Sequence, residues 1–336
     1  MKKLTIVALT CFLVLAVVLS GCSGKGPAGQ DGSAGDKPVV LKLGHVNSDK
    51  DLWQDGSLKF AELVSQKTGG KVKVEVYPSS QLGNDRDMAE GLQMGSVDFA
   101  LIAGVLGNFE PSIQLLEMPY LFRDDDHLRK VLYGPIGQEI FDKLLSSASI
   151  RGLTYWDRGP REVTSNKPIN SPADLKGLKI RVPEIPPMVA AWKAMGANPT
   201  PMAFGEVYTA LQQHTIDAQE NPISIIYSAR FNEVQKYLAM TNHKYEYVIL
   251  AMSDKTYQKL TPDQQKAVEE AAKEAADYYN NLVTSKTDQM LKELKDKGMQ
   301  VTTPNAEEFA KLAKTTHAEF ADKYGKDIYD RIINTK

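Results

Sequence analysis

The stretch "KIRVPEIPPMVAAWKAMGANPTPMAFGEVYTALQQ" (residues 179–213) decides the fold, because strand and helix patterns alternate along it. Ile180 and Val182 favour a buried strand, and Pro183 prevents that strand from continuing. "PMVAAWKAMG" follows as a predicted helix, "PTPMAF" as a short strand and "GEVYTALQQ" as a second helix. Such an alternating series predicts an α/β protein with a largely parallel sheet.

The same alternation occurs in the first half of the chain. Strands are predicted in "VVLKLGHV" (39–46), "KVKVEVYP" (71–78) and "VDFALIAG" (97–104), with helices over 53–67 and 85–95 between them. Two further strands, "GLTYWDRG" (152–159) and "REVTSN" (161–166), begin the second series. The segments "LQMGSVDFA" (92–100) and "LQQHTIDAQ" (211–219) occupy equivalent places in the two series. The sequence therefore predicts two lobes of similar build.

A long helix is predicted in the last third of the chain. Thr261, Pro262 and Gln264 form a helix start, and Gly298 marks the end. Apolar residues keep helical spacing between these points. Roughly 36 residues at 1.5 Å per residue span about 54 Å, more than the ~30 Å of a small domain. An unbroken helix of this length must cross both lobes.

The N-terminus has the features of a secretory signal peptide over residues 1–21. Lys2 and Lys3 precede an apolar run that ends in "LSGC" (19–22). "LSGC" resembles a lipobox, the processing site of bacterial lipoproteins, which makes Cys22 the predicted lipidation site. The alternative is an ordinary signal peptide in which Cys22 has no role. Residues 22–38 are rich in Gly, Ser, Ala and charge, and they predict a flexible tether.

Composition and motifs argue against several classes of function. Removal of Lys2 and Lys3 lowers the 40 Lys and Arg to 38, against 42 Asp and Glu, so nothing indicates nucleic acid binding. The five histidines lack metal-binding spacing, and no nucleophile elbow, phosphate loop or C-x-x-C motif is present. "DDDH" (124–127) is interpreted as an acidic first helical turn, with a metal site as the alternative. We expect no metal, no cofactor and a binding protein instead of an enzyme.

Four segments together resemble the solute-binding subunits of TRAP (tripartite ATP-independent periplasmic) transporters, over the chain from about residue 39 to the C-terminus. They are "GHV" (44–46), "QLGNDRDMAEGLQMGSVD" (81–98), "PADLKGLKIRVP" (172–183) and "NPTPMAFGEVYTALQQHTIDAQENP" (198–222). The resemblance implies a two-lobed clamp of the periplasmic-binding-protein type, with a long helix spanning both lobes. It implies lobe I over 39–158 with a return at about 247–285, and lobe II over 159–246 with about 286–336.

The resemblance also implies the ligand site. Arg181 matches the arginine that pairs with the ligand carboxylate, and Arg161 matches a second, more variable one. A guanidinium can hold a carboxylate with two parallel hydrogen bonds, which agrees with this role. From its strand alone, Arg181 could equally be a surface residue like Lys179. The remaining predicted ligand-binding residues are Phe204 and Asn221, and for the other lobe His45, Asn47 and Arg86, with Trp53 and Gln81 as weaker candidates.

The ligand implied is a small organic acid, either a C4-dicarboxylate or a uronate or other sugar acid. Sialic acid is a poor candidate, because "LIAGVLGN" (101–108) lacks the acidic residue of sialic-acid-binding members. The implied partners are the membrane permease subunits, and the protein itself is expected to be a monomer, lipid-anchored in the periplasm or at the cell surface. The alternatives are a sensor module and a lipoprotein enzyme acting on a sugar acid.

Overall fold

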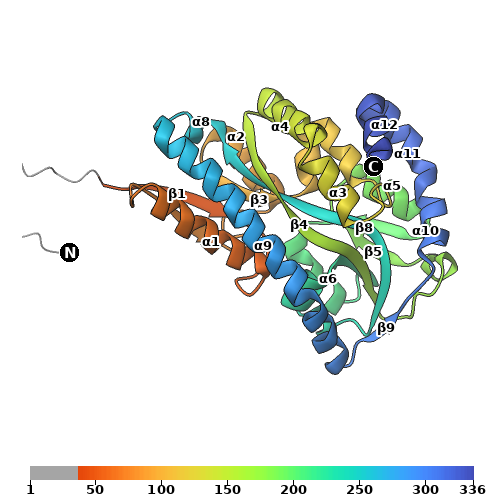
Figure 1. Cartoon of the computed structure of the whole chain (residues 1–336). Coiled ribbons are helices and arrows are strands. Elements are labelled where there is room, and N and C mark those ends of the chain that lie inside the picture. Colours follow the sequence, from red (N-terminus) through yellow and green to blue (C-terminus); the bar gives the residue numbers. More distant parts are fainter. Residues whose placement is uncertain (1–36) are drawn as a thin grey trace, which may run out of the picture. The chain divides into compact units, whose positions relative to one another are not determined.

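The structure is a computed structural model that describes residues 37–336 (Figure 1). The predicted signal peptide, Cys22 and the predicted tether up to residue 36 lie outside the described residues. Within residues 37–336, no helix is both long enough and apolar enough to span a membrane.

One mixed sheet of nine strands forms the centre of the described part of the chain. Its order is β2-β1-β3-β8-β4-β7-β5-β6, and β9 pairs with β8. The strands are β1 (Val39–Gly44), β2 (Val72–Tyr77), β3 (Phe99–Ile102), β4 (Ile150–Ser165), β5 (Lys179–Val182), β6 (Asn198–Pro201), β7 (Ala218–Pro222), β8 (Tyr237–Ser253) and β9 (Gln300–Thr302).

Two long antiparallel strands, β4 and β8, join the two ends of this sheet. They pair from Ile150 opposite Ser253 to Ser165 opposite Tyr237. The parallel strands β1–β3 attach to one end of β8, and the parallel strands β5–β7 attach to the opposite end of β4. The two predicted strands over 152–159 and 161–166 are therefore one strand, β4, interrupted only by bulges.

Helices cover both faces of the sheet (Figure 1). They are α1 (Leu52–Lys67), α2 (Asp85–Met94), α3 (Asp125–Leu132), α4 (Pro135–Ala148), α5 (Pro186–Ala194), α6 (Val207–Gln212), α7 (Ile223–Ser228), α8 (Asp254–Tyr257), α9 (Pro262–Asp296), α10 (Ala306–Ala313), α11 (His317–Tyr324) and α12 (Lys326–Asn334). Local signals in the sequence set several of these ends. Asn84 and Thr261 both form capping boxes, and Asp124 caps the acidic first turn of α3, as the sequence predicts.

Buried apolar side chains form one core at one end of the sheet and two smaller cores at the other. We call the end built on β1–β3 lobe I and the end built on β5–β7 lobe II. The unbroken 35-residue helix α9 contributes Val268 and Tyr279 to the core of lobe I and Leu294 to a core of lobe II. This confirms the two-lobed α/β fold with a helix that crosses both lobes (Figure 1).

The end of the chain departs from the predicted division of the lobes. Residues 286–336 were expected in lobe II, yet Phe320, Ile328 and Ile332 of α11 and α12 belong to the core of lobe I. Leu294 and Met299 enter one core of lobe II, and Phe309 and Ala313 of α10 enter the other. We therefore propose that α11 and α12 are part of lobe I, because a helix belongs to the lobe that buries its apolar face.

Candidate functional site

A cavity of about 50 Å³ lies where the two lobes meet. Lobe I contributes residues that follow β1 and β3, and lobe II contributes residues that follow β5 and β7. In open α/β sheets, ligands bind beyond the carboxyl ends of strands. A volume of this size holds one or two water molecules, which is less than an organic acid occupies. The lining residues are Val46, Asn47, Trp53, Asp85, Ala103, Gly104, Val105, Glu117, Arg158, Arg161, Arg181, Pro183, Ile185, Phe204, Asn221, Ile225 and Glu246.

Arg181 lies in the wall of this cavity, at the end of β5, and only 4% of it is exposed. Its Nε and Nη2 donate to the carbonyl oxygen of Met202 at 3.0 and 2.7 Å, and the ring of Phe204 lies 6.0 Å from the guanidinium carbon. Within the described residues no carboxylate forms an ion pair with it. Burial lowers the pKa of Arg181 to about 10. A buried cation without a counter-ion is costly and favours the binding of an anion.

Arg161, on β4, is buried in the same wall but is already neutralised. Glu220 accepts three hydrogen bonds from Arg161: Nη2 donates to its Oε1 and to its backbone carbonyl, each at 2.7 Å, and Nε donates to its carboxylate. Glu246 accepts a fourth, from Nη1 to its Oε2 at 2.7 Å. Burial would raise the pKa of Glu220, but Arg161 and His243 outweigh it and hold that pKa at about 2. One N–H on Nη1 is left for a ligand. Arg161 is therefore chiefly a structural cation, unlike Arg181.

A second group of buried charges lies beside Arg161 on the lobe I side. Lys244 Nζ lies 2.7 Å from Oε1 of Glu246 and 3.2 Å from Oε2 of Glu117. The hydroxyl of Tyr247 donates to the other oxygen of Glu117 at 2.7 Å. Burial raises the pKa of Glu117, although Lys244 opposes the change. One cation thus faces two carboxyl groups, so this group offers no unpaired cation to a ligand anion.

Asp85 is a cavity residue that the sequence reasoning missed. It is the first residue of α2, directly after the capping residue Asn84. Burial raises the pKa of Asp85 to about 6, and the nearby cations Arg181 and Arg158 oppose this rise. The predicted site residue Arg86 is the next residue, but it is exposed and does not line the cavity. No local signal could have found Asp85, because packing decides which side chains of a first helical turn face inward.

The other predicted site residues divide into two groups. Asn47, Trp53, Phe204 and Asn221 line the cavity. His45 does not: it is buried behind the wall, where its Nε2 lies 2.9 Å from Oε1 of Gln54 and its ring meets that of Trp53 edge-on. Burial lowers the pKa of His45, which agrees with a neutral structural residue. Gln81 is exposed and also lies outside the lining.

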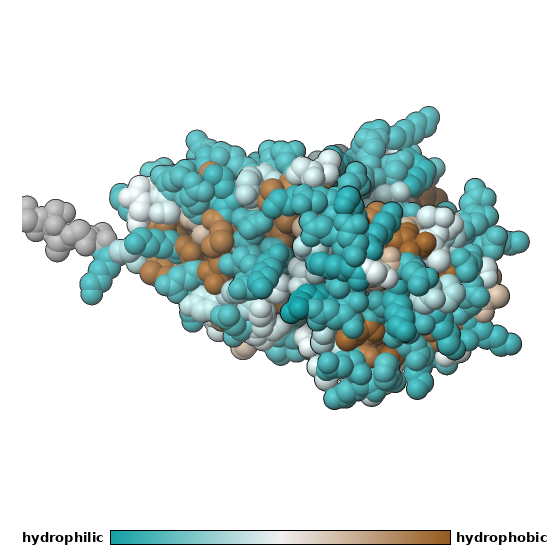
Figure 2. Space-filling view, turned by 90° about the horizontal axis from the view of Figure 1, so that it is seen from below, coloured by the Kyte–Doolittle hydropathy of each residue, from teal (hydrophilic) through white to brown (hydrophobic). Residues whose placement is uncertain are grey.

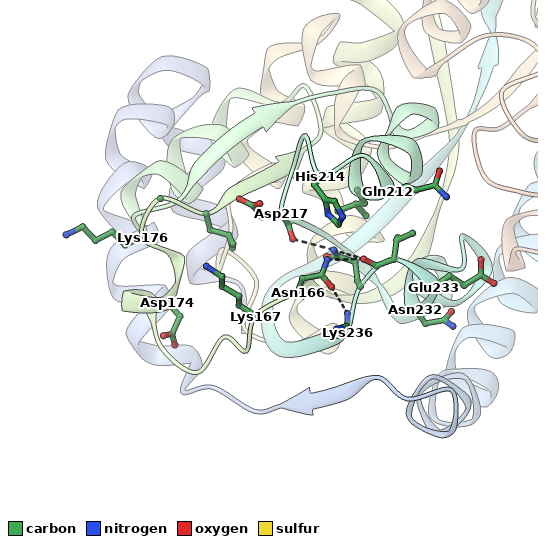
Figure 3. A pocket seen from close by; sticks show the side chains of 15 residues that line it. Asn166, Lys167, Asp174, Lys176, Gln212, His214, Asp217, Asn232, Glu233 and Lys236 are labelled. Atoms are coloured by element: carbon green, nitrogen blue, oxygen red, sulfur yellow. Dashed lines mark hydrogen bonds between the residues drawn. The ribbon is translucent and has the colours of Figure 1, made fainter.

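A larger hollow of about 680 Å³ lies on the outside of lobe II and is drawn in Figure 3. Four segments of that lobe line it, so closure of the clamp cannot enclose a ligand there. Its acidic groups have partners within lobe II: Asp174 accepts from the backbone of Ser171, and Asp217 accepts from the backbone of Lys179. The cavity between the lobes is therefore the better candidate for the functional site.

No grouping of three or more His, Cys, Asp and Glu side chains in residues 37–336 could hold a metal ion. The "DDDH" segment in particular is the capped start of α3, as the preferred interpretation holds: the carboxylate of Asp124 accepts from the backbone of His127 at 2.7 Å.

Two lobes with a cavity between them, and in its wall a buried arginine that has no ion pair in the described residues, have the architecture expected of a binding protein for a small anion. Comparison with known proteins places the chain more closely. The profile of DctP, the bacterial extracellular solute-binding protein family 7, matches residues 43–324. The chain belongs to this family, whose members are solute-binding proteins of TRAP transporters and not enzymes.

Individual relatives agree with this membership. The 2,3-diketo-L-gulonate-binding periplasmic protein YiaO of Escherichia coli is 38% identical over 295 residues, covering 87% of each chain. A TRAP periplasmic solute-binding protein of Roseobacter denitrificans, solved with bound L-galactonate, has a TM-score of 0.85 and 38% identity, covering 89% of this chain and 99% of that chain. A protein of Sulfurospirillum deleyianum with bound succinate has a TM-score of 0.84 and 34% identity over 89% and 99% of the chains.

Proposed function

We propose that this protein captures a small organic acid outside the cytoplasmic membrane, with Arg181 as the residue that binds the carboxylate, and delivers the acid to the membrane subunits of a TRAP transporter. The observation that carries the proposal is the buried guanidinium of Arg181, which faces the cavity between the lobes without an anionic partner. The two hydrogen bonds that it donates to the carbonyl oxygen of Met202 fix the plane of the guanidinium. A bidentate pair with a carboxylate would neutralise it.

The energies support a useful affinity. Hydrogen bonds to charged groups contribute roughly 1.5–3 kcal/mol each. Two such bonds supply a large part of the ~8 kcal/mol that corresponds to a micromolar dissociation constant. The relatives described above bind L-galactonate and succinate, each of which carries a carboxylate. They support an acid as the ligand of this protein.

A thermal-shift screen of organic acids tests the function. A ligand at 100 times its dissociation constant stabilises the folded state by about 2.7 kcal/mol. For a chain of this size we expect the melting temperature to rise by about 5 °C with at least one acid. The neutral alcohol of the same carbon skeleton is the control, and it should produce no rise. A stabilising alcohol, or no response to aldonates, uronates and C4-dicarboxylates alike, would contradict the proposal.

We further propose that Cys22 is lipidated and anchors the protein to the membrane through the tether. The "LSGC" site carries this proposal. In cells, Cys22→Ser should move the protein from the washed membrane fraction to the soluble fraction, because the lipid is the attachment, while ligand affinity stays unchanged. Ser23→Ala, next to it, is the matched control and should remain on the membrane. Retention of Cys22→Ser on washed membranes would show that the anchor lies elsewhere.

We also propose that the protein is a monomer. Apart from the neighbours Val39 and Val40, the exposed large hydrophobic residues in the described part of the chain are far apart in the sequence, and hydrophilic side chains separate the apolar ones on the face in Figure 2. Stable protein–protein interfaces need a contiguous, partly apolar area of about 800 Å² on each partner. The exposed residues are Val39, Val40, Leu58, Met94, Tyr133, Tyr278 and Ile333.

A further inference from the structure

Arg158 is a second arginine of the cavity wall whose donors are mostly unused. It is 6% exposed, and its Nε has no hydrogen-bond partner in the described residues. Its single ion pair there joins Nη1 to Oε2 of Glu246 at 4.0 Å, too long for a hydrogen bond. Its guanidinium carbon lies 4.7 Å from the ring centroid of Trp53, which holds the group in place from one side. The fixed guanidinium thus keeps donors available to a ligand.

A β-bulge explains why Arg158 reaches the cavity at all. Residues three apart on a regular strand point to opposite faces, so Arg158 and Arg161 should lie on opposite sides of β4. The register with β8 shifts between Asp157 and Gly159, which leaves Arg158 as the extra residue of the bulge. Gly159 has φ of +72°, a conformation that glycine adopts without strain. The bulge therefore brings both arginines to one cavity, a common role of bulges at functional sites.

The surroundings of Arg158 differ from those of Arg181 in charge. Three carboxyl groups, Asp85, Glu117 and Glu246, line the same cavity, and Glu246 is the ion-pair partner of Arg158. Asp85 also lies within the electrostatic influence of Arg158. Glu117 and Glu246 are already paired with Lys244 and Arg161, whereas Asp85 has no ion pair in the described residues. A second ligand carboxylate beside Arg158 would therefore meet the unpaired carboxyl of Asp85, and like charges repel strongly at low dielectric. A hydroxyl group would instead accept a hydrogen bond from Arg158 and donate one to Asp85.

We infer that Arg158 donates hydrogen bonds to the hydroxyl groups of the ligand, and that the protein therefore prefers polyhydroxy monocarboxylic acids (aldonates or uronates) to unsubstituted dicarboxylates. The inference rests on the proposed function, in which Arg181 binds the carboxylate. Arg181 then recognises any acid, and Arg158 together with Asp85 selects among acids.

Calorimetric titration of the wild-type protein with D-erythronate, L-galactonate, D-glucuronate and succinate tests the preferred class. At least one hydroxy acid should bind tenfold or more tightly than succinate. Equal or tighter binding of succinate would overturn the inference and leave the proposed function intact. Absence of binding by all four acids would instead overturn the proposed function, and with it the premise of the inference.

Two variants test the residue. Arg158→Met should weaken binding of the preferred hydroxy acid 10- to 100-fold and binding of succinate by no more than about threefold, whereas Arg181→Met should weaken both. Arg158→Lys keeps the charge and should restore part of the lost affinity; it also serves as the test if Arg158→Met does not fold. Equal losses of affinity for the hydroxy acid and for succinate in either Arg158 variant would show that Arg158 does not recognise the hydroxyl groups of the ligand.

Discussion

Arg181→Met is expected to lower the affinity for the acid ligand by a factor of 100 or more, without lowering the stability of the unliganded protein. The affinity falls because the ligand carboxylate would be buried at the end of β5 without the guanidinium that is placed to pair with it. A desolvated charge without a partner costs several kcal/mol, more than the bond energy alone. Of all the substitutions considered, we expect this one to affect binding most.

The stability of the unliganded protein, in contrast to its affinity, should not fall in Arg181→Met. Arg181 is buried, no carboxylate in the described residues pairs with it, and burial lowers its pKa. Replacement of such a cation by an apolar side chain of similar length removes an unfavourable desolvation term. We expect an unchanged or slightly higher melting temperature. Reduced binding without reduced stability is typical of a functional residue and not of a structural one.

Calorimetry with the best acid, together with thermal unfolding without ligand, measures both effects. Lys179→Met is the matched control, because Lys179 lies on the same strand but is exposed. It should change neither quantity. Arg181→Lys keeps the charge but cannot donate two parallel hydrogen bonds to a carboxylate. Its affinity for the acid should therefore lie between those of the wild type and Arg181→Met. Wild-type affinity in Arg181→Met would show that another group binds the carboxylate.

Local signals carried most of what the sequence predicts correctly. Capping boxes and apolar periodicity depend on a few neighbouring residues, and they placed α2 and α9 to within about two residues. The role of Arg181 was implied by the family resemblance instead, because its strand alone allowed a surface position equally well, so capping boxes and periodicity are the local features that succeeded. These features do not require knowledge of what packs against them.

Features that depend on distant partners were missed or misplaced. The sequence patterns predict no element for β8, the longest strand of the described chain, because β8 lies inside the sheet, where both of its faces are covered and no alternating pattern results. Arg158 was overlooked because only the bulge at Gly159 turns it toward the cavity. Arg86 was chosen over Asp85 because the direction of a side chain in a first helical turn follows from packing. Tertiary context, absent from a local pattern, decides these cases.

Arg161→Met is expected to lower the free energy of unfolding by about 3–5 kcal/mol, because it leaves Glu220 and Glu246 buried without their shared cation. The melting temperature should fall by about 6–10 °C. Arg151→Met is the matched control: Arg151 also lies on β4 and pairs with Asp254 at 2.6 Å, but the two side chains are 23% and 25% exposed. Partly solvated pairs contribute about 1 kcal/mol or less, so this control should lose little.

The pH dependence of this loss separates an uncompensated charge from a simple packing defect. In the wild type the pKa of Glu220 is held at about 2, below its ordinary value, so its contribution to stability is full at neutral pH and is lost as pH falls toward 2. Without Arg161, burial dominates and raises the pKa of Glu220. The variant then takes up a proton between pH 7 and pH 5 that the wild type does not.

The difference in stability between the wild type and Arg161→Met should therefore shrink at pH 5, and Glu220→Gln should partly rescue Arg161→Met at pH 7. A difference that is constant with pH and insensitive to Glu220→Gln would mean that Arg161 stabilises the fold through packing alone.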